Sequence, residues 1–406
     1  MKSFWISNQM YYKDASAELV QQLVNSPNVA TVREERVFRV SGSGPPRECH
    51  LTASGSANDI AEDTVDSWGS GEDSNAESQR SSSDENVQPD GEPQVGLRAL
   101  LVPEVWASGY SGQGVVVGII DTGALATHEA IGGNFRREFG WYDPETLKSE
   151  PYDADGHGTH TLGTIVGSKG IGVAPNATWI ACKGCRQGMD CHEADLLDCA
   201  QFMLCPTDPT GQTEDCSQAP HVINNSWGGG QNDPTFKSII DAWEQAGIIP
   251  VFSTGNRGPS CGSILSPADY PNVIAVGALT ESDRLRSDSA RGPTMTSQLK
   301  PELVAPGTEV LSAWGGGRDL YFAMNGTSMA APHVTGTIAL MLSANPKLTY
   351  NQVRQTLLKT ANQKSLSPTI MTCGEVNGSV FPNNFYGYGR VDAWNAVTSI
   401  RDTVAS

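Results

Sequence analysis

One serine in this sequence lies where a nucleophile could work. Ser328 follows Asn-Gly-Thr and precedes a nearly unbroken run of small and apolar residues from Met329 to Leu342. This run predicts a buried helix that has the serine at its N-terminal end and Pro332 in its first turn, where a missing N–H costs little. Unpaired backbone N–H groups and the positive end of the helix dipole favour a serine whose attack creates an oxyanion. Taken alone, however, a serine before a helix usually serves only as an N-cap.

Two other motifs could supply the partners that a nucleophilic serine needs. Asp121 follows an apolar run from Val115 to Ile120 and opens the sequence Asp-Thr-Gly, and His157 opens the sequence His-Gly-Thr-His. The histidine could act as general base toward Ser328 and as general acid toward the leaving amine, while the aspartate holds its tautomer. Asp-Thr-Gly is also the signature of aspartic proteases, but those enzymes need two such carboxylates and this sequence has no second copy.

With Asp, His and Ser in this chain order, the three motifs resemble those of the subtilisin-like serine proteases, the subtilase family. The resemblance covers roughly the last three quarters of the chain, residues 94–406. It implies a catalytic triad of Asp121, His157 and Ser328 and an acyl-enzyme on the serine. It also implies that no organic cofactor and no obligatory metal is required.

The histidines outside the triad are expected to have no catalytic role. By the family motif His-Gly-Thr-His, the second histidine, His160, is structural and faces the interior of the fold about one turn on. A zinc site formed with His157 is disfavoured, because metalloprotease helices place a glutamate between histidines that are four residues apart. The others are expected to be structural or to lie at the surface: His128, His192, His221 and His333.

The resemblance also assigns the oxyanion hole and one wall of the substrate cleft. Asn256 follows the apolar run Ile248–Ser253 by a Thr-Gly turn, and it would donate its side-chain amide to the oxyanion beside the backbone N–H of Ser328. Four residues resemble the family strand that lines the cleft and pairs with an extended substrate: Ser226, Trp227, Gly228 and Gly229.

The opposite wall of the cleft departs from the family pattern. Leu265 stands where the family often has glycine at the base of a pocket, so we expect a bulkier wall. The same loop helps to bind a weak cation in some relatives, but nothing in this sequence specifies calcium. We therefore predict no metal-binding residues, and a structural calcium ion stays an open alternative.

The nine cysteines divide into an isolated one and a set of eight. Cys49 stands alone in an acidic segment, and the other eight follow it in the region of resemblance. An even set is typical of cysteines that pair in an oxidising compartment, with 105 conceivable pairings. Zinc is the alternative, since Cys182 and Cys185 have the spacing of a zinc-binding pair and Cys191 precedes His192. Disulfides are favoured because a serine protease with a propeptide is expected outside the cell.

Residues 1–40 form a small unit ahead of the region of resemblance. It resembles the later half of a subtilisin-type propeptide, which acts as a chaperone and inhibitor in that family, and a generic α+β element is the alternative. Its predicted strands are Phe4–Ile6, Val29–Val32 and Val37–Val40. Its one predicted helix is amphipathic and has an apolar face of Leu19, Val20, Leu23 and Val24.

Residues 41–93 are rich in Ser, Gly, Asp and Glu and predict a disordered linker, in or just after which a propeptide would be cut. Between His50 and Pro93 stand eleven acidic residues and one basic one, so this segment carries more than half of the net charge of −18. This acidity argues against nucleic acid and membrane as partners. No apolar core of signal-peptide length follows Met1 and no transmembrane run occurs, so we expect a shortened gene product or export by another signal.

Residues 94–406 alternate apolar strands with helical stretches. This alternation predicts an α/β fold, a doubly wound and mostly parallel sheet with helices on both faces. The predicted strands are Val115–Ile120, Ala177–Cys182, His221–Asn225, Ile248–Ser253 and Val273–Val276. The predicted helices are His157–Val166, Glu193–Leu204, Thr235–Ala246 and one that begins with a capping box of Thr349 and Gln352.

We therefore expect a secreted, monomeric serine endopeptidase made as a zymogen, whose partners are polypeptide substrates and its own N-terminal segment. Two alternatives are left. A non-catalytic or unprocessed relative would keep the fold as a binding or regulatory protein, although every catalytic position has the required residue type. A sedolisin-type acid peptidase also uses a Gly-Thr-Ser serine, but its base is a glutamate, which argues against it in a chain with His157.

Overall fold

The computed structural model describes residues 1–40 and 88–401, so most of the predicted linker and Cys49 lie outside the described residues. The central element is a sheet of seven parallel strands in the order β12-β11-β10-β8-β4-β6-β5. In chain order the strands are β4 (Val116–Asp121), β5 (Trp141–Tyr142), β6 (Thr178–Lys183), β8 (Val222–Asn225), β10 (Ile249–Ser253), β11 (Ile274–Leu279) and β12 (Leu303–Pro306). All five predicted strands belong to this sheet.

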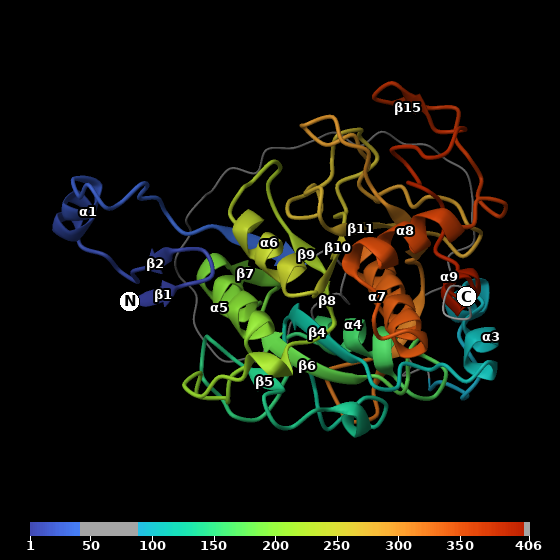
Figure 1. Ribbon diagram of the computed structural model, residues 1–406, viewed down its shortest axis with the longest axis horizontal. Coiled ribbons are helices and arrows are strands. Elements are labelled where there is room, and N and C mark those ends of the chain that lie inside the picture. Colours follow the sequence, from blue (N-terminus) through green and yellow to red (C-terminus); the bar gives the residue numbers. More distant parts are fainter. Residues whose placement is uncertain (41–87, 402–406) are drawn as a thin grey trace, which may run out of the picture. The chain divides into compact units, whose positions relative to one another are not determined.

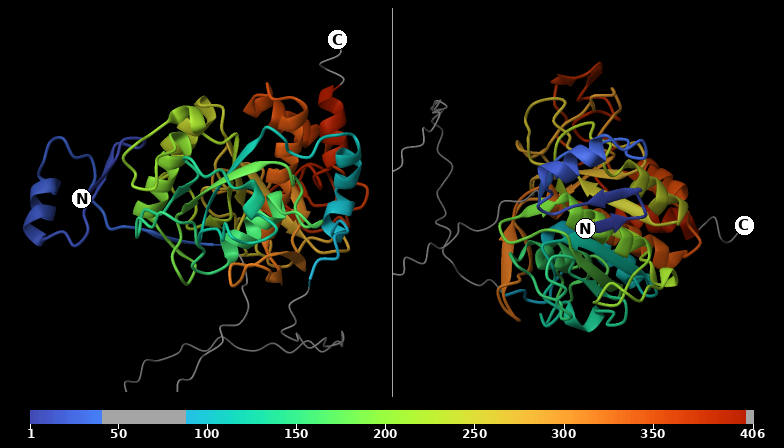
Figure 2. Two further views of the ribbon diagram at one scale, coloured as in Figure 1. Left: turned by 90° about the horizontal axis from the view of Figure 1, so that it is seen from below. Right: turned by 90° about the vertical axis from the view of Figure 1, so that its left-hand side faces the viewer.

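Helices cover both faces of the sheet, as Figure 1 and Figure 2 show. One face carries α4 (His157–Val166), α7 (Thr327–Ala344) and α9 (Ala393–Arg401), and the other carries α5 (Glu193–Leu204) and α6 (Lys237–Gln245). Helices α4 and α5 begin and end at the predicted residues. The doubly wound α/β fold predicted from the alternation of strands and helices is therefore confirmed.

Each central strand contributes to two apolar cores, because successive side chains of a strand point to opposite faces. In β4, Ile119 packs with the helices of one face and Ile120 with those of the other. Val222 and Ile223 divide in the same way in β8. Burial on both faces explains why these strands read as continuous apolar runs in the sequence.

Shorter elements complete the region after residue 88. They are α2 (Val95–Ala99), α3 (Val102–Ala107), α8 (Tyr350–Thr360), the hairpin of β13 (Val310–Ala313) and β14 (Tyr321–Met324), and the hairpin of β15 (Thr372–Cys373) and β16 (Val376–Asn377). Helix α8 has the predicted capping box, in which Thr349 and Gln352 each bind the backbone N–H of the other. In the two described ranges, no helix is both long and apolar enough to cross a membrane.

Helix α7 runs through the interior, which explains why its sequence is apolar on all sides. It begins at Thr327, two residues before the apolar run, after a turn at Gly326 whose φ of 139° suits glycine. Ser328 is therefore its second residue and Pro332 its sixth. The prediction that Pro332 falls in the first turn was wrong, because the helix starts before the first apolar residue.

The N-terminal unit differs from its prediction in two places. Its elements are β1 (Lys2–Phe4), β2 (Gln9–Tyr11), α1 (Ala17–Val24) and β3 (Val37–Val40). The strand predicted at Val29–Val32 is absent from the described structure, and β2 was not predicted. None of the residues of α1 is buried, because β1 and β2 form only a two-stranded sheet, which offers little surface for the apolar side of a helix.

Strand β3 pairs with the region of resemblance rather than with its own unit. It lies between β7 (Asp190–His192) and β9 (Trp227–Gly228) in a three-stranded sheet and runs antiparallel to both. Arg39 lies opposite Gly228 and Val40 lies opposite Trp227. The glycine-containing strand that was predicted to pair with an extended substrate thus pairs with a segment of the chain itself.

Four disulfides join all eight cysteines of the described residues: Cys182–Cys199, Cys185–Cys191, Cys205–Cys216 and Cys261–Cys373. The prediction that these eight cysteines pair is confirmed. The zinc alternative for Cys182, Cys185 and Cys191 is wrong, because a sulfur in a disulfide cannot serve as a thiolate ligand.

Candidate active site

The predicted site residues gather at the carboxyl edge of the parallel sheet. Strand β4 is flanked by β6 on one side and β8 on the other, and the chain crosses from β6 over β4 to β8, from which it continues outward through β10, β11 and β12. In open α/β sheets, such a switch point leaves a crevice at the carboxyl ends of the strands. Asp121 ends β4, Ser226 directly follows β8, and Asn256 lies three residues beyond the end of β10.

Asp121 and His157 form a buried pair. The Oδ1 atom of Asp121 lies 2.7 Å from Nδ1 of His157 and also accepts the backbone N–H of Thr122 at 2.8 Å. Both side chains are fully buried. Burial alone lowers the pKa of His157, but the charge and the hydrogen bond of Asp121, together with the charges of Asp155 and Asp153, outweigh burial, so the pKa of His157 lies above its usual 6.5. The aspartate therefore stabilises the protonated imidazole and fixes a proton on Nδ1.

Two glycines allow His157 to lie this close to the end of β4. Gly156, with φ of 112°, precedes α4, and a Cβ atom there would lie 2.6 Å from the ring of Trp314. A Cβ atom on Gly158 would lie 2.0 Å from the carbonyl oxygen of Gly123. The glycines of the His-Gly-Thr-His region are thus required by the close packing of α4 on the turn after Asp121.

Asp153 holds the first turn of α4 and was not identified from the sequence. Its carboxylate accepts the backbone N–H groups of Gly156 at 2.8 Å and Thr159 at 2.7 Å. It also accepts the hydroxyl of Thr122 at 2.8 Å, which ties the helix to the turn after Asp121. An acidic residue a few positions before a helix was the signal that could have identified it.

Ser328 and Ser226 bind each other by two hydrogen bonds. The hydroxyl of Ser328 donates to the carbonyl oxygen of Ser226 at 3.1 Å, and the hydroxyl of Ser226 donates to the carbonyl oxygen of Ser328 at 3.0 Å. The second bond exists because Pro332, four residues on, has no N–H to offer this carbonyl. Because of Pro332, the carbonyl oxygen of Ser328 accepts a side-chain hydrogen bond from Ser226, which joins the start of α7 to the segment predicted to line the cleft.

The other ring nitrogen of His157, Nε2, is a buried polar atom. Among the described residues, no hydrogen-bond partner is found for Nε2 of His157. Because Nδ1 carries the proton shared with Asp121, Nε2 is the basic nitrogen of the neutral ring. A buried acceptor of this kind can take a proton from a hydroxyl that rotates toward it.

Asn256 is oriented by the residue before Ser328. Its Oδ1 atom accepts both the backbone N–H of Thr327 at 3.0 Å and the hydroxyl of Thr327 at 2.8 Å. With the oxygen held in this way, the side-chain NH₂ of Asn256 is turned away from Thr327. Ser328 lies in the first turn of α7, where backbone N–H groups point out of the helix. Thr327 is therefore a positioning residue that sequence reasoning did not identify.

The predicted cleft is narrow beside Leu265. The backbone N–H of Gly229 donates to the carbonyl oxygen of Ser266 at 3.0 Å, which joins β9 to this wall. A Cβ atom on Gly255 would lie 2.6 Å from the side chain of Leu265, and one on Gly228 would lie 3.3 Å from it. Leu265 thus fills the space between the strand of the cleft and the turn that carries Asn256.

Two further histidines, His160 and His333, bind backbone carbonyl groups. His160 is buried and its Nε2 lies 2.9 Å from the carbonyl oxygen of Val310 and 3.0 Å from that of Phe322, so it joins α4 to the hairpin of β13 and β14. Burial lowers its pKa to about 3. Burial likewise lowers the pKa of His333 to about 4. Both rings are neutral at pH 7 and structural in their contacts.

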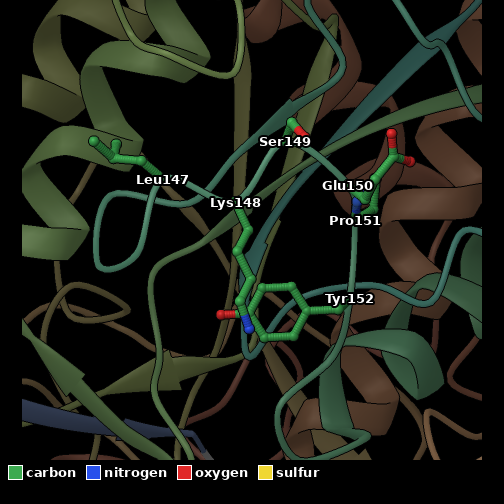
Figure 3. Close-up of a pocket in the computed structure, with 6 residues that line it drawn as sticks. All are labelled: Leu147, Lys148, Ser149, Glu150, Pro151 and Tyr152. Carbon is green, nitrogen blue, oxygen red and sulfur yellow. The ribbon is translucent and has the colours of Figure 1, made fainter.

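Two further features bear on the chemistry of these residues: the capacity for metal binding and a hollow at the surface. In residues 1–40 and 88–401, no group of three or more His, Cys, Asp or Glu side chains could hold a metal ion. A surface hollow shown in Figure 3 is lined by one loop, Leu147–Tyr152, in which Lys148 lies over the ring of Tyr152. The hollow contains none of the predicted site residues, so it has no part in the chemistry of Asp121, His157 and Ser328.

The sequence is similar to known proteases along most of the region after residue 94. Residues 112–389 match the model of the subtilase family. The chain is 38% identical over 328 residues to bacillopeptidase F of Bacillus subtilis (strain 168). The aligned segment covers 74% of this chain and 22% of that protein. It is 34% identical over 273 residues to subtilisin E of the same strain, which covers 66% of this chain and 65% of that protein.

One solved structure is similar in fold as well as in sequence. A cold adapted subtilisin-like serine proteinase matches with a TM-score of 0.53 and 30% sequence identity, and the match covers 64% of this chain and 86% of that one. The chain spans less than two thirds of the length of the two curated relatives named above.

Proposed function

Because the chain belongs to the subtilase family, we propose that it is a serine endopeptidase that hydrolyses peptide bonds of extended polypeptides through an acyl-enzyme on Ser328. The observation that carries this proposal is the buried hydrogen bond between Asp121 and His157, at the edge of the sheet where α7 presents Ser328. A role in binding alone does not explain a buried imidazole whose Nε2 has no hydrogen-bond partner among the described residues.

These positions support the following reaction. The Ser328 hydroxyl leaves the carbonyl of Ser226 and attacks the substrate carbonyl carbon, while its proton passes to Nε2 of His157. Asp121 stabilises the imidazolium that forms. The oxyanion accepts hydrogen bonds from the side-chain amide of Asn256 and the backbone N–H of Ser328, each of which is worth roughly 2.7 to 4 kcal/mol in the transition state.

The second half of the reaction returns every proton. The C–N bond breaks as His157 gives its proton to the leaving amine, and an ester on Ser328 remains. A water molecule then gives a proton to His157 and attacks the ester, and the proton passes back to the serine oxygen as the acid leaves. This scheme uses no organic cofactor and no metal ion, so none is proposed; a calcium ion, if bound elsewhere, would be structural.

The N-terminal unit is proposed to be the inhibitor of this site. Strand β3 pairs antiparallel with β9, the position proposed for a substrate backbone. Val40 lies opposite Trp227, the neighbour of Ser226, whose carbonyl oxygen accepts the Ser328 hydroxyl. A zymogen would be cut after Val40, within the segment that joins the two described ranges. Disulfides support an oxidising compartment outside the cell as its place of action.

Labelling with a fluorophosphonate probe tests the proposed activity. The full chain should form one adduct, which peptide mapping places on Ser328, and prior denaturation should prevent it. Ser328→Ala should fold and take no label, and Asn256→Ala should label and turn over roughly 10²- to 10³-fold more slowly. An intact chain that takes no label should gain it after mild proteolysis of residues 41–87. Failure at that stage would favour the alternative of a non-catalytic relative that binds peptides.

A further inference from the structure

Three arginines of the N-terminal unit each contact a different carboxylate of the cleft. Arg33 binds Glu193 with both ends of its guanidinium group. Arg36 binds Asp233 and also donates to the hydroxyl of Thr235 at 2.9 Å. Arg39 in β3 lies 2.9 Å from Asp190 in β7. Together the three carboxylates, Asp190, Glu193 and Asp233, form what we term the acidic rim.

The arginines are the main ionic partners of the acidic rim. The Glu193 side chain is 5% exposed and that of Asp233 11%, so both charges are largely removed from water. Arg36 also donates its backbone N–H to Glu193 at 3.2 Å. Departure of the N-terminal unit would therefore leave three neighbouring carboxylates without their guanidinium partners, a state that favours any other cation able to reach them.

The geometry of strand β3 keeps Arg39 apart from the apolar contacts of the same strand. Phe38 and Val40 point inward and are buried, and the ring of Phe38 lies edge-on to Trp227 and Phe236. Arg39 points outward, because successive side chains alternate along a strand. A peptide in the position of β3 would thus place two side chains among apolar residues and the side chain at position 39 beside Asp190 of the acidic rim.

We propose that the acidic rim selects substrates whose segment before the cleaved bond is basic, with arginine or lysine at the positions of Arg33, Arg36 and Arg39. This inference rests on the proposed function, because it treats β3 as an occupant of the substrate position. The bound segment is the independent sign of a ligand: a stretch of extended peptide already sits in the cleft with three cations on three carboxylates. The occupant proposed is a basic, extended polypeptide.

Matched peptide substrates test the inference on the full chain after mild proteolysis of residues 41–87, which releases the proposed inhibitor. The first is an internally quenched peptide with the sequence of residues 33–44, and the second replaces its three arginines with glutamine. We expect kcat/KM to be roughly tenfold higher for the arginine peptide, as three partly exposed ion pairs would give. The preference should lie mainly in KM and should shrink at about 0.5 M salt, because salt screens exposed pairs.

Variants of the protein locate the effect. Two further peptides replace arginine with glutamine only at position 36 or only at position 39. Asp233→Asn should lose the preference for arginine at position 36 and keep the preference at position 39, and Asp190→Asn should do the reverse. Glu281→Gln, which changes an exposed carboxylate after β11, is the matched control and should keep both preferences. The peptide comparison on the unchanged protein needs no variant, so a folding defect in one variant leaves the test intact.

The outcomes separate this inference from the proposed function. If Ser328 is labelled and both peptides are cut equally well at low salt, the acidic rim serves only the chain's own N-terminal unit and the inference is overturned. If no label and no cleavage occur even after mild proteolysis of residues 41–87, the proposed function fails. In that case fluorescence anisotropy of the two labelled peptides decides the inference, since tighter binding of the arginine peptide supports it and equal binding overturns it.

Discussion

At the scale of single residues, two carboxylates act on His157 in different ways. Asp121 accepts a hydrogen bond from the ring, whereas Asp155, two residues before the histidine, raises the pKa of His157 only through its charge. Burial raises the pKa of Asp155 itself, and the neighbouring His157 lowers it in part. The basic form of His157 is the one that accepts a proton from Ser328, so both carboxylates set the lower pH limit of activity.

Asp155→Asn should move the acid limb of the kcat/KM profile to lower pH. Removing the negative charge lowers the pKa of His157, so the neutral ring persists to lower pH. Asp121→Asn should instead lower kcat on the order of 10⁴-fold at all pH values, because the ring of His157 is no longer held in the tautomer that carries its proton on Nδ1. The profiles are measured with a neutral peptide substrate, and Glu150→Gln in an exposed loop is the control. An acid limb that stays in place in Asp155→Asn would contradict this assignment of the charge effect.

At the scale of elements, α4 shows why the site depends on more than its triad. The helix carries His157 in its first turn and His160 one turn on, and His160 binds both strands of the hairpin of β13 and β14. Protonation of His160 is opposed by burial of the ring, by the charge of His157, and by the position of Nδ1, which is buried and has no hydrogen-bond partner among the described residues. The orientation of α4, and with it that of His157, therefore depends on a neutral histidine.

The pKa of His160 predicts a loss of stability in acid. Between pH 6.5 and about 3 the unfolded chain binds a proton that the folded chain does not, so stability falls as pH falls through this window. In a Ser328→Ala background, which prevents self-digestion, Tm should drop between about pH 7 and pH 4.5. His160→Gln should have a lower Tm at pH 7 and a smaller drop in acid. An unchanged acid drop in His160→Gln would assign the effect to other groups, such as His333.

Periodicity in the sequence predicted the elements of the sheet but not what occupies the cleft. Strand β4 could be predicted because burial on both faces of the sheet leaves a local pattern in the sequence. Helix α4 could be predicted because burial at the start of a helix also leaves a local pattern. The pairing of β3 with β9 could not, since it depends on residues nearly two hundred positions apart. The strand predicted at Val29–Val32 failed because a short apolar run forms a strand only where another strand can pair with it.

For the candidate site as a whole, the sequence predicted the candidate residues but not the contacts that hold them in place. Motifs marked Asp121, His157, Ser328 and Asn256, because each needs a particular functional group. The contacts of Thr327 with Asn256 and of Ser226 with Ser328 carry no motif of their own. They arise from the meeting of distant segments, so only the fold reveals them.

At the scale of the whole molecule, the disulfides divide into local and long-range links. Cys185 and Cys191 are six residues apart and close a turn beside β7, whereas Cys261 and Cys373 are 112 residues apart. The long link joins the loop after Asn256 to the hairpin of β15 and β16. Because a disulfide restricts the unfolded chain more when it closes a longer loop, the two links should differ in what they contribute to stability.

Removing the long link should destabilise the protein about twice as much as removing the short one. The chain-entropy relation gives roughly 4–5 kcal/mol for the Cys261–Cys373 loop and about 2 kcal/mol for the Cys185–Cys191 loop. The paired Cys→Ser variants are compared by thermal unfolding at one heating rate, in the Ser328→Ala background, with the unchanged background treated with reductant as a reference. A larger loss for the short link would mean that strain or packing at β7, rather than the unfolded chain, governs the contribution of these disulfides. In that case the short link would act chiefly by holding β7 against the strand that occupies the cleft.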